Sequence, residues 1–397
     1  MIPRQNMLSC LCEFNDNIAH AMNQQVLHLW IENIHVRDLR CHHDQQWLLK
    51  SGVNMLVGEN GCGKTTILEA VYIMANGRSF RQSRDPELVR WQCKMMHIHG
   101  IWHRYGPLNI KVNGQRRKTD IQMQGRKLAK RKELIEALPV IVDAPQGKRI
   151  IDGVNNERRK WLDQLMIQCN PLIQHHYHAF LRALMQRSRV LRKNGSDDEL
   201  SAWEVQMVQY GRPVELARQR LCEKISQALS QEKDLTEKLL SIKAKSCLPD
   251  NDDEWSKMLM NNRQQDRRMG RCTLGPHTDK ISVLFDDKEI RSVGSRGQQK
   301  LAAVAIRLVE TQLRQAHQHL WPVLLLDDCF EALDSMRRIS LIRRLCRYPG
   351  QVLVTAPNLE VLPTELSVHI LRIKALKEDV ANLNDTSFKS QNKIYAT

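Results

Sequence analysis

The chain has 397 residues, which is long enough for a sizeable core and for about two domains. Its 60 Lys and Arg against 44 Asp and Glu give a formal net charge of +16, which favours a polyanionic partner. Eleven dispersed cysteines without a C-x-x-C pair argue against a disulfide framework or a zinc site, and no apolar run reaches the ~18 residues of a membrane span.

The N-terminal residues show neither a signal peptide nor an early strand, so we expect a cytoplasmic protein with reduced thiols. The first expected strand covers residues 26–31, and residues 1–25 are predicted to be a disordered extension. Met22 lies just before that strand. We hypothesise that Met22 is the native start, which N-terminal sequencing of the cell-made protein would test.

The phosphate loop at residues 58–65 is the most specific motif in the chain. It has the pattern G-x-x-x-x-G-K-T, follows an apolar strand pattern at 53–57 and precedes a helical pattern that ends near Gly77. A strand, a glycine loop and a helix start together aim backbone N–H groups at a polyphosphate. We expect Lys64 to contact the β- and γ-phosphates and the Thr65 hydroxyl to bind Mg²⁺. The residues predicted to contact the nucleotide here are Gly58, Glu59, Asn60, Gly61, Cys62, Gly63, Lys64, Thr65 and Thr66.

A β-rich lobe and a basic segment are expected next. Residues 96–112 mix apolar and polar positions, and Asn113 with Gly114 is a typical hairpin turn. Residues 111–132 hold nine cations against Asp120 alone, which is typical either of a solvated surface or of contacts with DNA phosphates. Two further basic sets lie at 182–193 and 263–271. The residues predicted to bind DNA are Arg116, Arg117, Lys118, Arg126, Lys127, Lys130, Arg131 and Lys132.

A helical pattern covers residues 156–240, with a break at 194–198 that predicts antiparallel helices. One apolar face is expected at Leu181, Leu184, Met185, Ser188 and Leu191, and a second at Val214, Ala217, Leu221, Ile225, Ala228 and Leu229. The segment is far too short for a long coiled coil. We therefore expect a compact helical lid.

Two downstream motifs indicate the class of ATPase. Ser295, Gly297 and Gln298 open an apolar-rich helix and offer a hydroxyl and free N–H groups to an anion, although Ser and Gly also cap many ordinary helices. About thirty residues later an apolar strand at 323–326 ends in Asp327 and Asp328. This order is typical of the signature and Walker B motifs of ATP-binding-cassette ATPases. Asp327 is predicted to hold Mg²⁺ with Thr65, and Asp328 to polarise the attacking water; a solvated strand end is the weaker alternative.

Together these motifs resemble those of the RecF family, short bacterial relatives of the SMC-type ATPases, from about residue 26 to about residue 375. Further matching segments are 38–40, 77–81, 157–163, 182–187 and 274–277. The chain departs from the family pattern at Cys41, where Asn is usual, and at 278–280, where Arg-Asp-Asp is common.

The resemblance implies an α/β fold, with an ABC-type P-loop ATPase head (a mixed sheet with helices), a compact helical lid lobe and no long coiled coil. The expected parts are an ATPase lobe at 26–155 and 261–376, a lid at 156–260 and a mobile tail at 377–397. The resemblance also places Arg40 among the nucleotide-binding residues and His277 near the lid or the sheet lobe.

The implied function is an ATP-binding, DNA-binding protein of recombinational repair and replication. ATP would join two copies, with Ser295, Gly297 and Gln298 of one copy facing the γ-phosphate held by the other, and this homodimer would close on gapped or single-stranded DNA. The expected partners are RecR and RecO and, indirectly, RecA, in support of the SOS response. Because Asp328 is one methylene shorter than the usual Glu, a slow, DNA-stimulated ATPase is expected.

Two other classes of protein contain such an ATPase head. The ATPase of a DNA-defence nuclease would need an added metal-binding carboxylate domain, and nothing after Asp334 supplies one. A transporter ATPase subunit usually carries a switch histidine, whereas the segment 351–356 ends in Thr and Ala. The histidines at 42–43 and 175–178 lack partners at metal-ligand spacing, so a surface or packing role is favoured.

Overall fold

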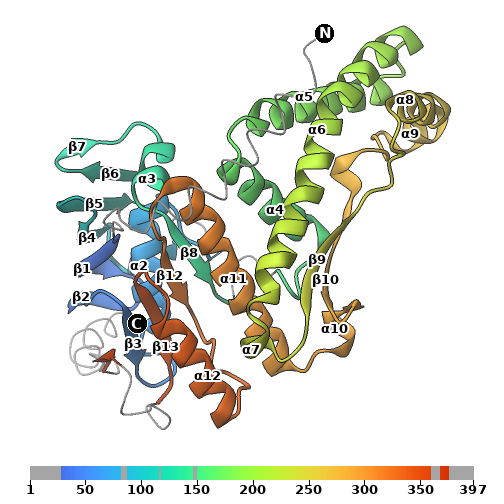
Figure 1. Ribbon diagram of the computed structural model, residues 1–397. Helices are drawn as coiled ribbons and strands as arrows, with labels where there is room; N and C mark the ends of the chain where they lie inside the picture. The colour runs from blue at the N-terminus through green and yellow to red at the C-terminus, as the bar shows by residue number, and fades with distance from the viewer. Residues whose placement is uncertain (1–27, 82–86, 116–117, 146–149, 359–366, 375–397) are drawn as a thin grey trace, which may run out of the picture.

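The computed structural model describes residues 28–81, 87–115, 118–145, 150–358 and 367–374, which form a body with two large sheets and an arm of helices (Figure 1). The predictions for residues 1–25, for Met22 and for the tail at 377–397 lie outside the described residues. Of the strand predicted at 26–31, residues 26 and 27 lie outside the described residues, and the first long strand, β1, begins at Trp30. Among the described helices, none is both long and apolar enough to cross a membrane.

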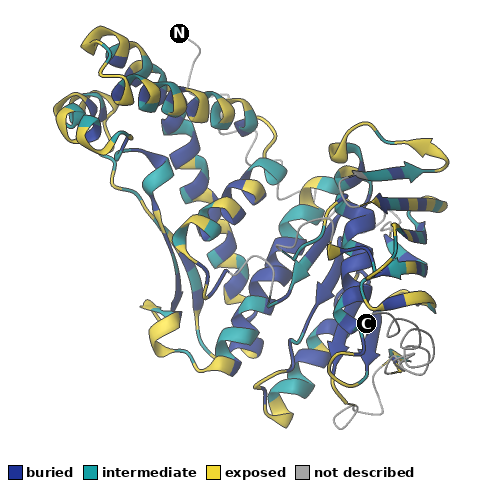
Figure 2. Ribbon diagram, turned by 180° about the vertical axis from the view of Figure 1, so that it is seen from behind, coloured by how far each residue is buried: buried dark blue, intermediate teal, exposed yellow. Residues whose placement is uncertain are grey.

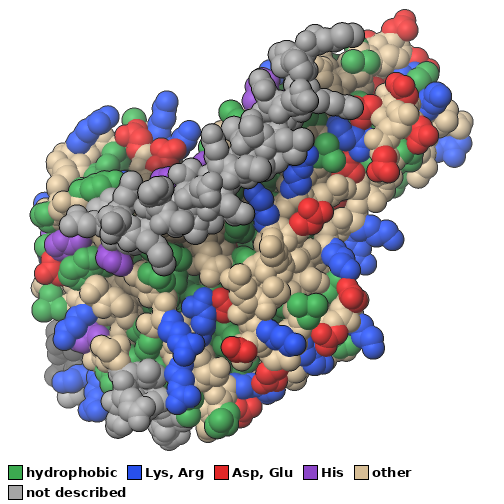
Figure 3. Space-filling view, in the orientation of Figure 1, with side chains coloured by type: hydrophobic (Ala, Val, Ile, Leu, Met, Phe, Trp, Pro, Cys, Tyr) green, Lys and Arg blue, Asp and Glu red, His purple; other side chains and the backbone are tan. Residues whose placement is uncertain are grey.

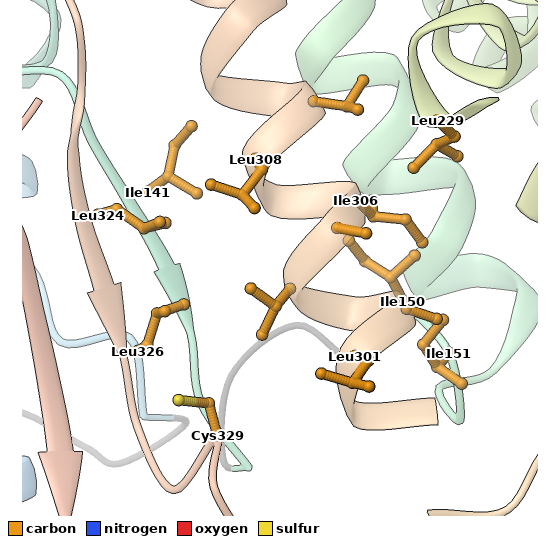
Figure 4. Packing of buried hydrophobic residues seen from close by; sticks show 14 of the residues in the cluster. Ile141, Ile150, Ile151, Leu229, Leu301, Ile306, Leu308, Leu324, Leu326 and Cys329 are labelled. Carbon is orange, nitrogen blue, oxygen red and sulfur yellow. The ribbon is translucent and has the colours of Figure 1, made fainter. Parts of the chain in front are cut away.

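Five parallel strands carry the phosphate loop, in the order β14-β3-β13-β12-β8. Both faces of this sheet are covered, so its central strands are apolar almost throughout. Met55 and Leu324 belong to one core with α11, whereas Leu56 and Leu325 belong to the other with α2 (Figure 4 shows part of the first core). The bounds are β3 Val53–Val57, β8 Val140–Asp143, β12 Val323–Leu326, β13 Val352–Ala356, β14 Val368–Arg372, α2 Lys64–Asn76 and α11 Arg296–Gln318.

The predicted strands at 53–57 and 323–326 are confirmed residue for residue. The helix after the loop is also confirmed, and it ends at Gly77, whose left-handed backbone (φ 65°) caps it. These elements depend on local sequence, since an apolar run, a glycine loop and a helical repeat follow one another along the chain.

An antiparallel sheet with strand order β2-β1-β4-β5-β6-β7 lies beside the parallel one and shares a core with α2. It confirms the predicted β-rich lobe. Its strands alternate buried and exposed residues, because one face packs on that core and the other meets water. The bounds are β1 Trp30–Leu39, β2 His42–Leu48, β4 Met95–His103, β5 Pro107–Gln115, β6 Lys118–Met123 and β7 Arg126–Lys127, followed by α3 Arg131–Ala137.

The predicted hairpin turn at Asn113 and Gly114 is wrong. Both residues lie within β5, where they pair with Asp120 and Thr119 of β6. A Cβ on Gly114 would collide with the side chain of Met96 from the neighbouring strand β4. The glycine therefore marks a close approach between strands instead of a turn.

The arm contains the expected helical lid, but it extends past the predicted bound at residue 260 to include residues 263–269 and 280–285. It also contains a small sheet that the sequence did not predict. β9 (Leu240–Lys245) pairs with β10 (Lys280–Phe285), and β11 (Lys288–Glu289) pairs with the other edge of β10. A capping box of Ser196 and Glu199 begins α6, which agrees with the predicted break. The helices are α4 Asn155–Cys169, α5 Ile173–Arg192, α6 Asp197–Ser230, α7 Lys233–Thr236, α8 Asp252–Asn261 and α9 Arg263–Met269, followed by η3 Pro276–Thr278, α10 Ile290–Val293 and, in the body, α12 Ser335–Cys346.

The two helices of the lid hairpin differ in how well their buried faces were predicted. The face of α6 is confirmed, with Val214, Leu221, Ile225 and Leu229 buried. The face of α5 is confirmed only in part, because Leu191 is buried and Leu184 packs against the lid core, whereas Met185 is 60% exposed. The residues of α5 that are buried are Ile173, Phe180, Ala183, Arg187 and Leu191 (Figure 2).

A buried arginine explains why α5 buries a different set of residues from the one predicted. Arg187 is fully buried and donates hydrogen bonds to Glu204 of α6 at 2.9 Å and to Asp266 of α9 at 2.6 Å. Arg263 pairs with Glu204 at 2.6 Å. Arg187 and Arg263 belong to the basic sets that the sequence offers as DNA contacts, but these two arginines hold the lid helices together. Removing one partner of such a buried ion pair strongly destabilises the fold, because the other charge is left buried and unpaired.

Candidate nucleotide-binding site

The glycines of the phosphate loop adopt backbone conformations that other residues avoid. Gly61 and Gly63 have φ of 86° and 94°, in the left-handed region. A Cβ on Gly63 would collide with the ring of His42, whose Nε2 lies 3.2 Å from the Gly63 carbonyl oxygen. Burial lowers the pKa of His42, so a neutral ring packs under the loop. The turn brings the start of α2 against the loop, as phosphate binding requires.

The lysine of the motif lies across the loop. Lys64 is buried, and its Nζ donates hydrogen bonds to the carbonyl oxygens of Gly58 at 2.6 Å and Glu59 at 2.8 Å. Its positive charge is therefore held at the centre of the loop, close to the N-terminus of α2. The helix dipole and the lysine both favour an anion at this point.

Thr65 and Asp327, predicted from distant parts of the chain to share a metal, lie together. The Thr65 hydroxyl donates to Asp327 Oδ1 at 3.1 Å, and the Thr355 hydroxyl donates to the same oxygen at 2.9 Å. Burial, and then the charge of Asp328, raise the pKa of the Asp327 carboxyl, while the hydrogen bonds from Thr355 and Thr65 lower it. Hard oxygen donors of this kind suit Mg²⁺.

Asp328 lies at the end of β12 with a left-handed backbone (φ 53°). Its backbone N–H donates to Thr355 Oγ1 at 2.9 Å, and its carbonyl oxygen accepts from Lys300 at 3.0 Å. These contacts fix the backbone at a strained position, as occurs at functional sites. Asp328 lines a cavity of about 340 Å³ together with Asn60 of the loop, Thr355 and Arg338.

The signature residues lie at the start of α11. Ser295 and Gln298 satisfy each other in a capping box at the start of α11. A Cβ on Gly297 would lie 2.8 Å from the carbonyl oxygen of Ala332, so the signature turn rests on the loop that follows Asp328. A second cavity of about 370 Å³ is lined by Arg296 of the signature segment. Neither of these two cavities is lined both by the phosphate loop and by the signature.

The comparisons with known proteins identify the family of the chain. The profile of the RecF/RecN/SMC N-terminal domain family matches residues 30–376. The DNA replication and repair protein RecF of Stenotrophomonas maltophilia is 30% identical over 86% of this chain and 96% of its own length. RecF of Halalkalibacterium halodurans is 28% identical over 83% of this chain and 93% of its own length. The chain belongs to the RecF family.

A solved structure of similar fold is described as the recombination mediator protein RecF-ATPrS in the RecFOR pathway. It has a TM-score of 0.71 and 22% identity, and the match covers 88% of this chain and 98% of that one. This likeness supports the ABC-type head fold that the RecF motifs implied.

The RecF motifs at 38–40 and 77–81 meet at one buried carboxylate that sequence reasoning missed. Glu69 of α2 is fully buried and accepts hydrogen bonds from Arg40 Nε at 2.5 Å and Arg40 Nη2 at 2.8 Å. Ser79 also donates to Glu69, and Arg81 lies 3.6 Å from it. Arg40 thus braces the turn after β1 against the helix of the phosphate loop. Its contact with the nucleotide stays a prediction.

The basic segment predicted to bind DNA is partly neutralised. Arg116 and Arg117 lie outside the described residues, as does the side chain of Lys118. The other cations are exposed near β7 and α3, where acidic side chains lie among them (Figure 3). The ion pairs are Arg126 with Glu133 at 3.9 Å, Lys127 with Asp120 at 2.8 Å and Lys132 with Glu136 at 3.6 Å. Glu133 and Glu136 lie beyond residue 132, so they do not belong to the cation-rich segment 111–132.

The histidine of the G-P-H element, His277, packs against the lid helix α5. Within the described residues, no group of three or more His, Cys, Asp or Glu is arranged to hold a metal ion. His277 of the RecF G-P-H element lies in the lid, 3.0 Å from the Cys272 carbonyl oxygen and near the Phe180 ring. Burial lowers its pKa, so it packs as a neutral ring.

Thr355 is the second residue that sequence reasoning missed. Its segment, 351–356, served in the sequence only to show that a switch histidine is absent. Thr355→Val should remove the hydroxyl that bridges Asp327 and Asp328 and destabilise the fold by ~1–3 kcal/mol. Loss of a donor to Asp327 raises its pKa further, so the affinity for Mg²⁺-ATP should begin to fall at a higher pH than in the wild type.

The measurements are thermal unfolding and titration of Mg²⁺-ATP between pH 5 and pH 8. Thr355→Ser keeps the hydroxyl and serves as the matched control, which should behave like the wild type. Equal pH profiles for Thr355→Val and wild type would show that the bridge does not act on Asp327.

Proposed function

We propose that this RecF-family chain binds ATP at the phosphate loop and hydrolyses it slowly. The observation that carries this proposal is the convergence of Lys64, Thr65 and Asp327, which come from two distant segments. Lys64 would hold the β- and γ-phosphates, and the backbone N–H groups of the loop would bind the remaining oxygens. Thr65 and Asp327 would hold Mg²⁺, which supplies charge neutralisation for phosphoryl transfer.

Asp328 is proposed to orient the attacking water. It is held at the cavity wall by its backbone contacts with Thr355 and Lys300. Phosphoryl transfer depends mainly on such positioning and on charge stabilisation. An Asp at this position reaches less far than a Glu, which accounts for the proposed slow turnover.

The complete site is proposed to need two copies of the chain. Glu331 and Ala332 line both cavities, so the loop after Asp328 separates the nucleotide side from the signature side of one copy. Ser295, Gly297 and Gln298 would therefore meet the γ-phosphate of a second copy. ATP would then act as a ligand that favours the paired state, and hydrolysis would release it.

The proposed partner of the pair is DNA, which the net charge of +16 favours. The curated relatives named above are described as DNA replication and repair proteins, and the related structure belongs to the RecFOR pathway. We infer a cytoplasmic role in recombinational repair at gaps, with RecO and RecR assisting RecA loading and the SOS response.

Sedimentation of the wild-type protein tests the proposal. With a slowly hydrolysed ATP analogue, Mg²⁺ and gapped duplex DNA, the protein should sediment as a dimer on DNA, and with ADP it should sediment as a monomer. A single copy at high concentration in the presence of ATP and DNA would contradict the proposal.

A further inference from the structure

The outer side of helix α5 carries positive charge without compensation. The 20 residues of this helix include no Asp or Glu. Its exposed residues include Arg182, Arg189 and Arg192, and Lys193 follows directly. Within the described residues, no carboxylate lies within 4 Å of these four cations, in contrast to the three paired cations near β7.

Three acidic groups of the lid already have arginine partners. Glu204 binds Arg187 and Arg263, and Asp266 binds Arg187. Asp197, at the start of α6, binds Arg267 at 2.8 Å. The lid therefore uses its inner arginines to satisfy these carboxylates. The outer arginines of α5 gain no counter-charge from them.

These cations form one row. Positions 182, 189, 192 and 193 recur at intervals of three, four and seven residues, which places them on one side of the helix. At 1.5 Å per residue the row is about 15 Å long. A second element adds to it, because the stem of Arg192 packs against Gly270 at the end of α9, with the exposed Arg268 and Arg271 on either side in sequence.

The row is also rigid. Arg187 lies on the opposite side of α5 and is tied to α6 and α9 by fully buried ion pairs. The helix therefore cannot rotate without breaking these pairs, so the outer arginines keep their relative positions. A fixed row of cations loses less conformational freedom on meeting a charged partner than mobile side chains on a loop.

We propose that this surface, formed by Arg182, Arg189, Arg192, Lys193, Arg268 and Arg271, is the main contact with the phosphate backbone of DNA. We call it the lid cationic surface. Duplex DNA carries about one phosphate charge per 1.7 Å of axis, so a row of this length meets several phosphates. The inference deepens the proposed function and rests on it.

An acidic protein is the less favoured occupant. Exposed apolar residues beside the row are few, chiefly Leu181, Met185 and Met269. A stable protein interface needs about 800 Å² on each partner and an apolar centre, which three separate side chains do not supply. Arginines with little apolar surface between them suit a phosphate backbone better.

The test replaces Arg182, Arg189 and Arg192 together by glutamine, which keeps the side-chain stems and the helix propensity. Binding of gapped duplex DNA is measured with the ATP analogue over a range of salt concentrations. The affinity at about 0.1 M salt should fall at least tenfold, and the salt slope should decrease by about 0.9 for each lost phosphate contact. Arg→Lys at the same three positions should stay within about threefold of the wild type, since phosphate contact needs the charge.

The comparison variant changes the same amount of charge at the competing candidate surface near β7, which the sequence predicted to bind DNA, with Arg126, Lys127 and Lys132 replaced by glutamine. It should stay within about threefold of the wild type because these cations already have partners. An unchanged affinity and salt slope in the lid variant would overturn the inference, as would a loss confined to the comparison variant. Loss of binding to an acidic protein with DNA binding intact would also overturn it.

Thermal unfolding of each variant separates loss of contact from loss of fold. Where the triple glutamine variant unfolds, the single changes Arg182→Gln, Arg189→Gln and Arg192→Gln decide the result, because each lost phosphate contact should lower the salt slope by about 0.9. Failure of the wild type to bind DNA would instead overturn the proposed function. The two failures are therefore distinguishable.

Discussion

Replacing Lys64 with methionine should abolish ATP binding and, with it, dimerisation. Methionine keeps most of the buried stem, so the fold should persist, but the charge at the centre of the loop is lost. Charge-assisted hydrogen bonds contribute ~1.5–3 kcal/mol each, so loss of two to the phosphates should weaken ATP binding at least about a hundredfold. Equilibrium titration with a fluorescent ATP analogue measures this directly.

Lys132→Met is the matched control for that experiment. Lys132 is 70% exposed and pairs only with Glu136 on the surface, so its loss should leave ATP affinity unchanged. Tight ATP binding by the Lys64→Met variant would show that the phosphate loop is not the nucleotide site. The dimer measured by sedimentation should disappear in the same variant.

Replacing Asp328 with asparagine should have the opposite effect on assembly. Asparagine keeps the size of the side chain and leaves the backbone contacts with Thr355 and Lys300 in place. It cannot accept a proton from the attacking water, and such general-base assistance contributes about 10²–10⁴-fold to a rate. The ATP-bound dimer should therefore accumulate on DNA while phosphate release falls at least about a hundredfold.

Glu331→Gln is the control for Asp328→Asn. Glu331 lines the same cavity but is 75% exposed, and it lies 3.8 Å from Lys300, so its change should have little effect on turnover. Single-turnover hydrolysis and sedimentation on DNA are measured for both variants. If Lys64→Met and Asp328→Asn behaved alike, binding and hydrolysis would not be separate steps.

Sequence patterns determined the elements that form and support the phosphate loop. The strand at 53–57, the loop, α2, β12 and the start of α11 were all predicted correctly. Each is a local pattern, in which an apolar run or a helix cap is set by neighbours within a few residues. The link between Thr65 and Asp327 also followed, because both motifs place their polar ends at the same edge of a parallel sheet.

Contacts between distant segments could not be predicted from such local patterns. Asn113 and Gly114 are residues typical of a hairpin turn, yet Gly114 makes room for Met96 from another strand. Arg187 has the charge of a surface residue, yet it faces Glu204 and Asp266 in the lid interior. Glu69 accepts hydrogen bonds from Arg40 and Ser79, which lie in two different loops outside α2.

The sequence by itself determined the family, the phosphate loop and the two aspartates, because these depend on short runs of residues whose chemistry is visible in order. Only the tertiary structure decided which arginines face inward and which face solvent. The physical reason is that a buried charge is tolerated only where a partner meets it, and the carboxylate partner of Arg187 in α9 lies 79 residues away along the chain.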